Sequence, residues 1–191
     1  MKDMDNNVEA EIRKLFVTQA SVSNYLSIIS QKMKNDNFDP DIVVGLSRGG
    51  LPPGIMMSHY LNKPFIPFET ALRDFPVWKS NTKALESVNK ILIIDDICDS
   101  GETFVKLKQE LKEALPNLQV KFASLHHNKS ASFKPNWYGT LIDKAIDDVW
   151  IVYPWEDWWQ RDTVENTLVN EMLGNISVSY THLTLPTILR V

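Results

Sequence analysis

Short runs of consecutive apolar residues recur along the chain, each bounded by polar or glycine-rich turns. Runs of this length predict buried strands, and a run that contains prolines suits the edge of a sheet. The runs occupy residues 42–46, 64–68, 90–97, 120–125 and 149–153. We therefore expect five strands, with the run 90–97 in the centre and prolines in the run 64–68 that suit either an edge strand or the end of a strand.

Between these runs, apolar residues recur at spacings of three and four, which is the period of an amphipathic helix. This pattern covers residues 18–34, 51–61 and 104–115, and the prolines at 52 and 53 suit the first turn of a helix. Strands that alternate with helices predict an α/β fold, a doubly wound, mainly parallel sheet flanked by helices.

Three further segments lie outside this alternation. Residues 69–88 are polar and without clear period, which predicts a long loop that is either a functional lid or disordered. Residues 164–174 predict a final short helix. Residues 178–187 can be encoded by the transposon-end adapter of sequencing libraries. We therefore expect one domain over residues 1–176 and a non-native tail at 177–191.

Composition narrows the class of protein. A chain of 191 residues with 43% hydrophobic residues can bury one core, and its net charge of −4 argues against a nucleic-acid binder. The single cysteine, Cys98, fits a reducing compartment. No apolar run reaches membrane-spanning length and the N-terminus has no apolar signal core, so we expect a cytoplasmic protein without a membrane partner.

The segment from Ile91 to Phe104 carries the clearest chemical signal. Four aliphatic residues lead to adjacent carboxylates, and a third carboxylate precedes a Ser-Gly-x-Thr turn that opens a helical pattern. Carboxylates at a strand end can hold ribose hydroxyls or Mg²⁺, and amide groups at a helix start can bind a phosphate. The residues concerned are Asp95, Asp96, Asp99, Ser100, Gly101, Glu102 and Thr103.

A second loop, Ser47-Arg48-Gly49-Gly50, follows the strand predicted at 42–46. Glycine lets the backbone approach a ligand closely, and arginine forks onto two phosphate oxygens, so this loop suits a pyrophosphate. On its own the pattern is equally compatible with a glycine turn and a solvated arginine.

The segment 91–104 resembles the phosphoribosyl pyrophosphate (PRPP) signature of type I phosphoribosyltransferases, and the loop 47–50 resembles the pyrophosphate loop of the bacterial xanthine–guanine and hypoxanthine (6-oxopurine) enzymes. The resemblance implies a Mg²⁺-dependent transfer of phosphoribose from PRPP to guanine, xanthine or hypoxanthine in purine salvage. It assigns the sugar and the metal, partly through water, to Asp95 and Asp96. It also implies a cis peptide at Arg48–Gly49 and a flexible hood loop at residues 69–88.

For PRPP, the resemblance implies contacts from Ser47, Arg48, Gly49, Asp95, Asp96, Asp99, Ser100, Gly101, Glu102 and Thr103. Catalysis is assigned to Asp99, close to N7 of the base, and to Arg48 at the departing pyrophosphate. The base is assigned to Lys129, Trp150 and Ile151, the lysine with a register uncertain by a residue or two. The family's usual form is a homodimer or homotetramer.

Other interpretations stay open. The chain can be a PRPP- or nucleotide-sensing regulator on the same fold, or a phosphoribosyltransferase for a non-purine acceptor. His126 and His127 lack a convincing third metal ligand, so we expect packed or exposed histidines. Cys98 and Trp155 are expected to have packing roles.

Overall fold

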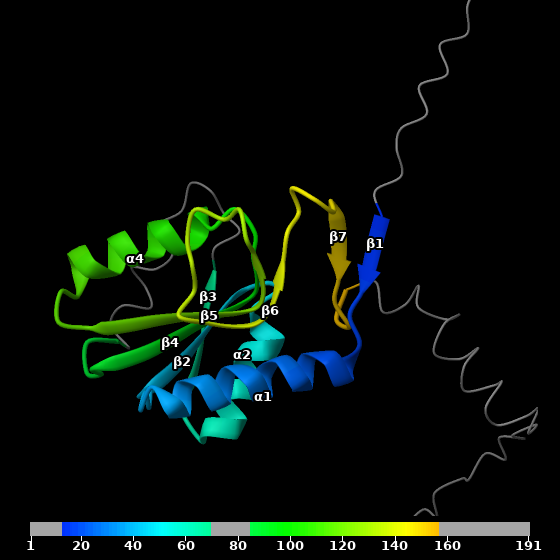
Figure 1. Cartoon of the computed structure of the whole chain (residues 1–191). Helices are drawn as coiled ribbons and strands as arrows, with labels where there is room; N and C mark the ends of the chain where they lie inside the picture. The colour runs from blue at the N-terminus through cyan, green and yellow to red at the C-terminus, as the bar shows by residue number, and fades with distance from the viewer. Residues whose placement is uncertain (1–12, 70–84, 157–191) are drawn as a thin grey trace, which may run out of the picture. The chain divides into compact units, whose positions relative to one another are not determined.

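A five-stranded parallel sheet forms the centre of the molecule in the computed structural model, which describes residues 13–69 and 85–156 (Figure 1). The strand order is β3-β2-β4-β5-β6, and every neighbouring pair is parallel. Its strands are β3 (Phe65–Glu69), β2 (Ile42–Ser47), β4 (Lys90–Cys98), β5 (Gln119–Asn128) and β6 (Trp137–Ile142). The predicted parallel α/β fold is confirmed, with β4 in the middle and the proline-containing β3 at an edge.

Helices cover both faces of this sheet (Figure 1). The helices are α1 (Gln19–Asn35), α2 (Leu51–Leu61) and α4 (Glu102–Ala114). One apolar core includes Ile29 of α1 and Met57 of α2 against Leu92 of β4, and the other includes Phe104 of α4 against Ile93. Neighbouring β4 residues thus serve opposite cores, which is why this strand reads as a continuous aliphatic run.

The starts of the first two helices follow from their sequences. Thr18 caps α1 because its Oγ1 accepts a hydrogen bond from the Ser21 amide at 3.1 Å. Prolines occupy the first turn of α2, where no intrahelical donor is lost. Gly54 brings α2 close to β2, since a Cβ at that position would lie 3.1 Å from the Gly45 Cα. This close packing places the β2–α2 loop directly above the sheet.

A two-stranded parallel sheet, β1 (Arg13–Phe16) and β7 (Val149–Val152), lies beside the main sheet (Figure 1). The run 149–153 does form a strand, but it pairs with β1 and not with the central sheet. Neither β1 nor β6 was expected. Every residue of β1 is exposed, so its sequence lacks the alternation of apolar and polar residues that marks a strand. The sequence of β6 is interrupted by Gly139, which packs against the Cβ of Tyr25.

The connection between β5 and β6, residues 129–136, contains no helix. Parallel neighbours are usually joined by a dozen or more residues that include a helix. Here the short crossover runs back over the α4 side of the sheet, and Phe133 packs against Phe104 and Phe122 at ring-centroid distances of 5.5 and 5.0 Å. The crossover therefore reaches the beginning of α4.

The remaining predictions fall on residues outside this description. They are most of the loop 69–88, the helix at 164–174, the domain boundary at 176 and the tail 177–191. Among the helices described, none has the length and apolar character needed to cross a bilayer.

Candidate active site

The loops that carry the predicted motifs follow adjacent strands of the sheet. Residues 47–50 follow β2, residues 99–101 follow β4, and residues 129–136 follow β5. Ligands of open α/β sheets bind beyond the carboxyl ends of the strands. The fold therefore gathers the two motifs at the edge where such a ligand is expected.

Gly49 packs directly against the carboxylate of Asp96. A Cβ at position 49 would lie 1.9 Å from Asp96 Oδ2, so only glycine allows this approach. Gly50 also packs closely against β4, since a Cβ at position 50 would lie 2.5 Å from the Ile94 carbonyl oxygen. The two glycines thus hold the loop 47–50 on the end of β4.

The cis peptide bond of this loop is Ser47–Arg48. The expectation that Arg48–Gly49 would be cis is therefore wrong by one bond: the cis linkage joins the last residue of β2 to the loop, and Gly49 instead provides the close contact with Asp96. Arg48 itself is exposed.

Asp95 and Asp96 bend back onto their own backbone. Asp95 Oδ1 accepts a hydrogen bond from the Asp96 amide at 3.0 Å, and Asp96 Oδ1 accepts one from the Ile97 amide at 2.7 Å. Burial, and after it the negative charge of Asp96, raises the pKa of Asp95 well above its ordinary value. Two close carboxylates in a packed environment repel each other, and a cation would relieve that repulsion.

The start of α4 forms a compact turn. Gly101 has φ of +83°, a left-handed conformation that favours glycine, and Ser100 Oγ accepts a hydrogen bond from the Glu102 amide at 3.3 Å. Ser132 of the crossover donates to the Ser100 carbonyl through its amide at 2.8 Å and its hydroxyl at 2.7 Å. The β5–β6 connection therefore fixes the turn at Ser100, directly before α4, where the free backbone amides of the helix start are available to bind a phosphate.

Asp99 lies between side chains from two other segments. Asn128, at the end of β5, donates through Nδ2 to Asp99 Oδ1 at 3.0 Å. Lys144, in the β6–β7 connection, donates through Nζ to Asp99 Oδ2 at 2.8 Å. Sequence reasoning selected Asp99 but neither of its partners.

Buried hydrogen bonds connect the residue that follows β7 to β4 and β5. The Tyr153 hydroxyl donates to the Asp96 carbonyl at 2.8 Å and contacts His126 Nδ1 at 2.8 Å. Since the hydroxyl proton is used for Asp96, we assign the donor at the second contact to His126 Nδ1. Burial lowers the pKa of His126 to about 4, so the ring is neutral at pH 7.

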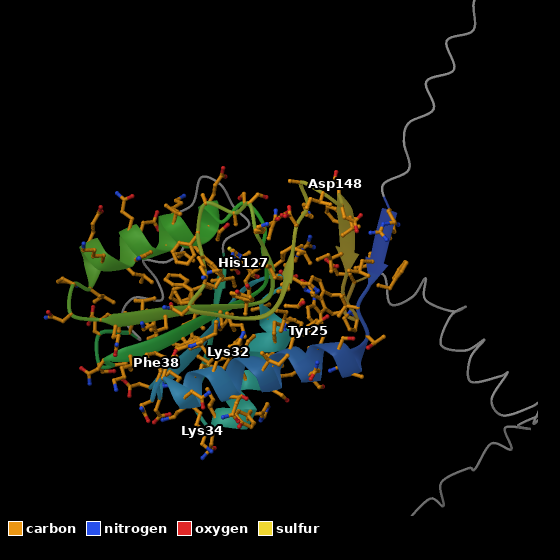
Figure 2. All side chains as sticks on the ribbon, in the orientation of Figure 1. Tyr25, Lys32, Lys34, Phe38, His127 and Asp148 are labelled. Carbon is orange, nitrogen blue, oxygen red and sulfur yellow. The ribbon has the colours of Figure 1, made fainter. Side chains whose placement is uncertain are left out.

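The neighbouring histidine also fits packing and not metal binding. His127 (Figure 2) is buried, and burial lowers its pKa. In residues 13–69 and 85–156 no group of three or more His, Cys, Asp or Glu side chains is placed to hold a metal ion. Cys98 is buried, and burial, with the charges of Asp95 and Asp99, raises the pKa of its thiol to about 12. A thiol of this kind is a poor nucleophile.

The residues assigned to the base have different exposures. Trp150 is 57% exposed, whereas Ile151 is buried in the core. Trp155 stacks on Tyr153 at a centroid distance of 4.9 Å, in keeping with a packing role. In the sequence, Trp150 lies on β7 between Lys144, which contacts Asp99, and Tyr153, which contacts the Asp96 carbonyl of β4.

Lys129 lies away from the carboxylate of Asp99. Its side chain is 66% exposed, and its Nζ pairs with Asp143 Oδ2 at 3.4 Å. The lysine that meets Asp99 is Lys144. The register of the base-site lysine was left open in the sequence, and the geometry offers Lys144 as a second candidate.

The model of the phosphoribosyl transferase domain family matches residues 14–157, which include every helix and strand described above apart from Arg13, the first residue of β1. The chain belongs to the phosphoribosyltransferase family. This confirms the resemblance drawn from the two motifs.

Relatives of this phosphoribosyltransferase domain include enzymes and a regulator. It is 27% identical to the xanthine-guanine phosphoribosyltransferase of Idiomarina loihiensis, over 60% of this chain and 70% of that one. It is 29% identical to the transcriptional regulator GfcR of Thermoplasma acidophilum, over 44% of this chain and 42% of that one. The match to the regulator therefore spans less than half of the regulator's length.

The fold is also that of a solved enzyme. The purine phosphoribosyltransferase of Pyrococcus horikoshii superposes with a TM-score of 0.60 at 24% identity, covering 76% of this chain and 95% of that one. At 24% identity, this structural similarity shows a shared fold and nothing further.

The motifs identified the loops, but not the contacts that hold them. Asn128, Lys144, Ser132 and Tyr153 were not selected. Asn128 ends β5, beyond the end of the strand predicted at 120–125, so the rule that ligands bind beyond strand ends would have drawn attention to it. Lys144 follows β6, which was itself not predicted, and no local pattern marks it.

Proposed function

We propose that this phosphoribosyltransferase domain transfers phosphoribose from PRPP to a 6-oxopurine (guanine, xanthine or hypoxanthine), giving a nucleoside monophosphate and pyrophosphate in purine salvage. One observation carries the proposal: a glycine loop, a carboxylate pair, a helix start and a separately held carboxylate follow adjacent parallel strands. These four parts match the pyrophosphate, ribose, 5′-phosphate and base of one reaction.

The phosphate-bearing half of the site involves two loops. Ser100 through Thr103 would hold the 5′-phosphate with backbone amides and hydroxyls. Ser47, Arg48 and Gly49 would hold the pyrophosphate, with Arg48 stabilising the charge that grows on it as it leaves. The exposed position of Arg48 leaves its guanidinium accessible to such a ligand.

The carboxylate pair suits a ribose and Mg²⁺. Mg²⁺ is commonly held by one or two carboxylates together with substrate phosphates and water. Asp95 and Asp96 offer that donor set. The pKa of Asp95 is raised first by burial and then by the negative charge of Asp96, and a cation would offset the second effect. When bound, Mg²⁺ would supply positive charge against the pyrophosphate.

At the base, Asp99 would accept or orient the proton at N7 while C1 of the ribose gains oxocarbenium character. Trp150 would stack on the planar ring, and the backbone of Ile151 would read its edge. Lys129 remains a candidate for the exocyclic oxygen. Homodimeric or homotetrameric assembly and a cytoplasmic location remain predictions of the sequence.

A second candidate function is a regulator that binds PRPP or a nucleotide without turnover. The similarity to the GfcR regulators of Thermoplasma acidophilum and Methanococcoides burtonii favours it. The net charge of −4 is unfavourable for direct nucleic-acid binding by this chain.

Two measurements on the full chain separate these functions. Calorimetry with PRPP and Mg²⁺ measures binding, and pyrophosphate release across guanine, xanthine, hypoxanthine, adenine and a pyrimidine panel measures transfer. We expect binding and release with at least one 6-oxopurine. Tight PRPP binding without release would favour the regulator, and release only with a pyrimidine would refute the purine assignment.

A further inference from the structure

Both carboxylate oxygens of Asp99 have side-chain partners, although the residue lies on a loop. Each of its two oxygens has its own partner, Asn128 at 3.0 Å and Lys144 at 2.8 Å. These partners come from different segments, the end of β5 and the β6–β7 connection. Asn128 is 6% exposed and the Lys144 side chain is 19% exposed, so both are held well inside the loops.

Asn128 joins the three segments through one amide group. Its Nδ2 donates to Asp99, while its Oδ1 accepts from the Lys144 amide at 3.2 Å and the Ser130 hydroxyl at 3.1 Å. Both ends of the amide are therefore used. The same side chain fixes the Asp99 carboxylate and the backbone of the residue that brings the cation to it.

This arrangement leaves Asp99 oriented but accessible. Its side chain keeps 46% of its exposure, although both oxygens have protein partners. Partners on both oxygens limit the orientations that the carboxylate can take. The Nζ of Lys129 pairs instead with Asp143.

We propose that Lys144, together with Asn128, is a positioning residue that orients the Asp99 carboxylate for the reaction. This inference rests on the proposed function. It assigns the cation that contacts Asp99 to the β6–β7 connection, and it leaves Lys129 as the candidate for the exocyclic oxygen of the base.

The alternative is an ion pair that only stabilises the fold. A double-mutant cycle separates the two, because residues that act through one another give non-additive effects. The four proteins are the wild-type full chain, Asp99→Asn, Lys144→Met and the double variant. The readouts are kcat, KM for PRPP and KM for the best base.

Removal of the Lys144 charge should lower kcat by about 10- to 100-fold, which is less than the typical loss of about 10²- to 10⁴-fold for an acid–base group itself, while KM for PRPP changes by less than about threefold. In the Asp99→Asn background the same change should alter kcat by less than about twofold. Lys144→Arg should restore most of the activity, because it returns the charge. If Lys144→Met fails to fold, Lys144→Gln keeps a polar stem and takes its place in the cycle.

The matched control is Lys106→Met, which removes a lysine paired with Glu110 at 3.9 Å on the exposed side of α4 and should leave kcat unchanged. Lys129→Met tests the rival position. Additive effects of Asp99→Asn and Lys144→Met, or a non-additive cycle between Asp99 and Lys129 instead, would overturn the inference. A wild-type protein without turnover on any base would overturn the proposed function as well, whereas an active wild type with an additive cycle overturns only this inference.

Discussion

At the scale of single residues, the candidate site depends on close contacts that no sequence pattern reveals. Asp99 was selectable because it stands at a fixed place in a motif. Its partners Asn128 and Lys144 were not, because their proximity to Asp99 arises only when three loops meet. The cis bond was expected one residue too late because the expectation was carried over from the family resemblance, and no residue pattern in the loop 47–50 marks which of its bonds is cis.

Gly49→Ala should damage the site more than the fold. The added Cβ would lie 1.9 Å from Asp96 Oδ2, so the carboxylate or the loop must move. We expect PRPP-dependent turnover to fall by more than about tenfold, the cost of misplacing a binding group. Gly139→Ala, which meets Tyr25 Cβ at 2.4 Å, is the control for strain outside the two loops and should lower the melting temperature instead. Wild-type turnover in Gly49→Ala would refute the assigned role.

Trp150→Ala tests the proposed stacking contact. The side chain is 57% exposed, so its removal should shift the melting temperature by only a few degrees. Loss of an aromatic contact worth about 1 kcal/mol should raise KM for the base about fivefold and leave KM for PRPP unchanged. Phe16→Ala, an equally exposed aromatic on the paired strand β1, should change neither constant. An unaltered KM for the base in Trp150→Ala would remove this residue from the base site.

At the scale of elements, periodicity predicted the strands and helices that serve the two cores. Residues 18–34, 51–61 and 104–115 were expected as helices and correspond to α1, α2 and α4 within a few residues. The missed strands, β1 and β6, lack that signal because β1 is exposed throughout and β6 is only partly buried. Their formation depends on pairing with strands distant in sequence.

Phe104→Ala should show how firmly α4 is anchored. Phe104 is buried and meets Phe122 and Phe133 at centroid distances of 5.0 and 5.5 Å. Its truncation should lower the free energy of unfolding by about 3–5 kcal/mol in urea titrations. Val105→Ala, on the exposed side of the same turn, should change it by less than about 0.5 kcal/mol. A loss below about 1 kcal/mol for Phe104→Ala would contradict this packing.

At the scale of the whole molecule, long-range polar contacts join the small sheet to the central one. Tyr153 connects β7 to the Asp96 carbonyl and to His126, and Tyr25 of α1 (Figure 2) meets the His126 ring edge-on at 5.1 Å. A neutral, buried histidine at this junction makes the stability of the whole domain depend on pH.

The free energy of unfolding should decrease as pH falls, because the buried His126 resists protonation. Its pKa is lowered from 6.5 to about 4 in the folded state, so the unfolded chain binds the proton first as pH drops through that window. The resulting loss approaches about 3 kcal/mol at pH 4. Urea unfolding of the wild type and His126→Gln at pH 7, 5.5 and 4.5 measures it. The difference in stability between the two proteins should shift toward His126→Gln as pH falls; a difference independent of pH would contradict the assignment.

The central claim is that the gathered loops transfer phosphoribose to a purine. The most direct test incubates the full chain with PRPP, Mg²⁺ and each 6-oxopurine, and measures nucleoside monophosphate and pyrophosphate together. We predict equal amounts of both products with at least one base, and loss of both in Asp99→Asn. PRPP binding without either product, for every base, would contradict the claim.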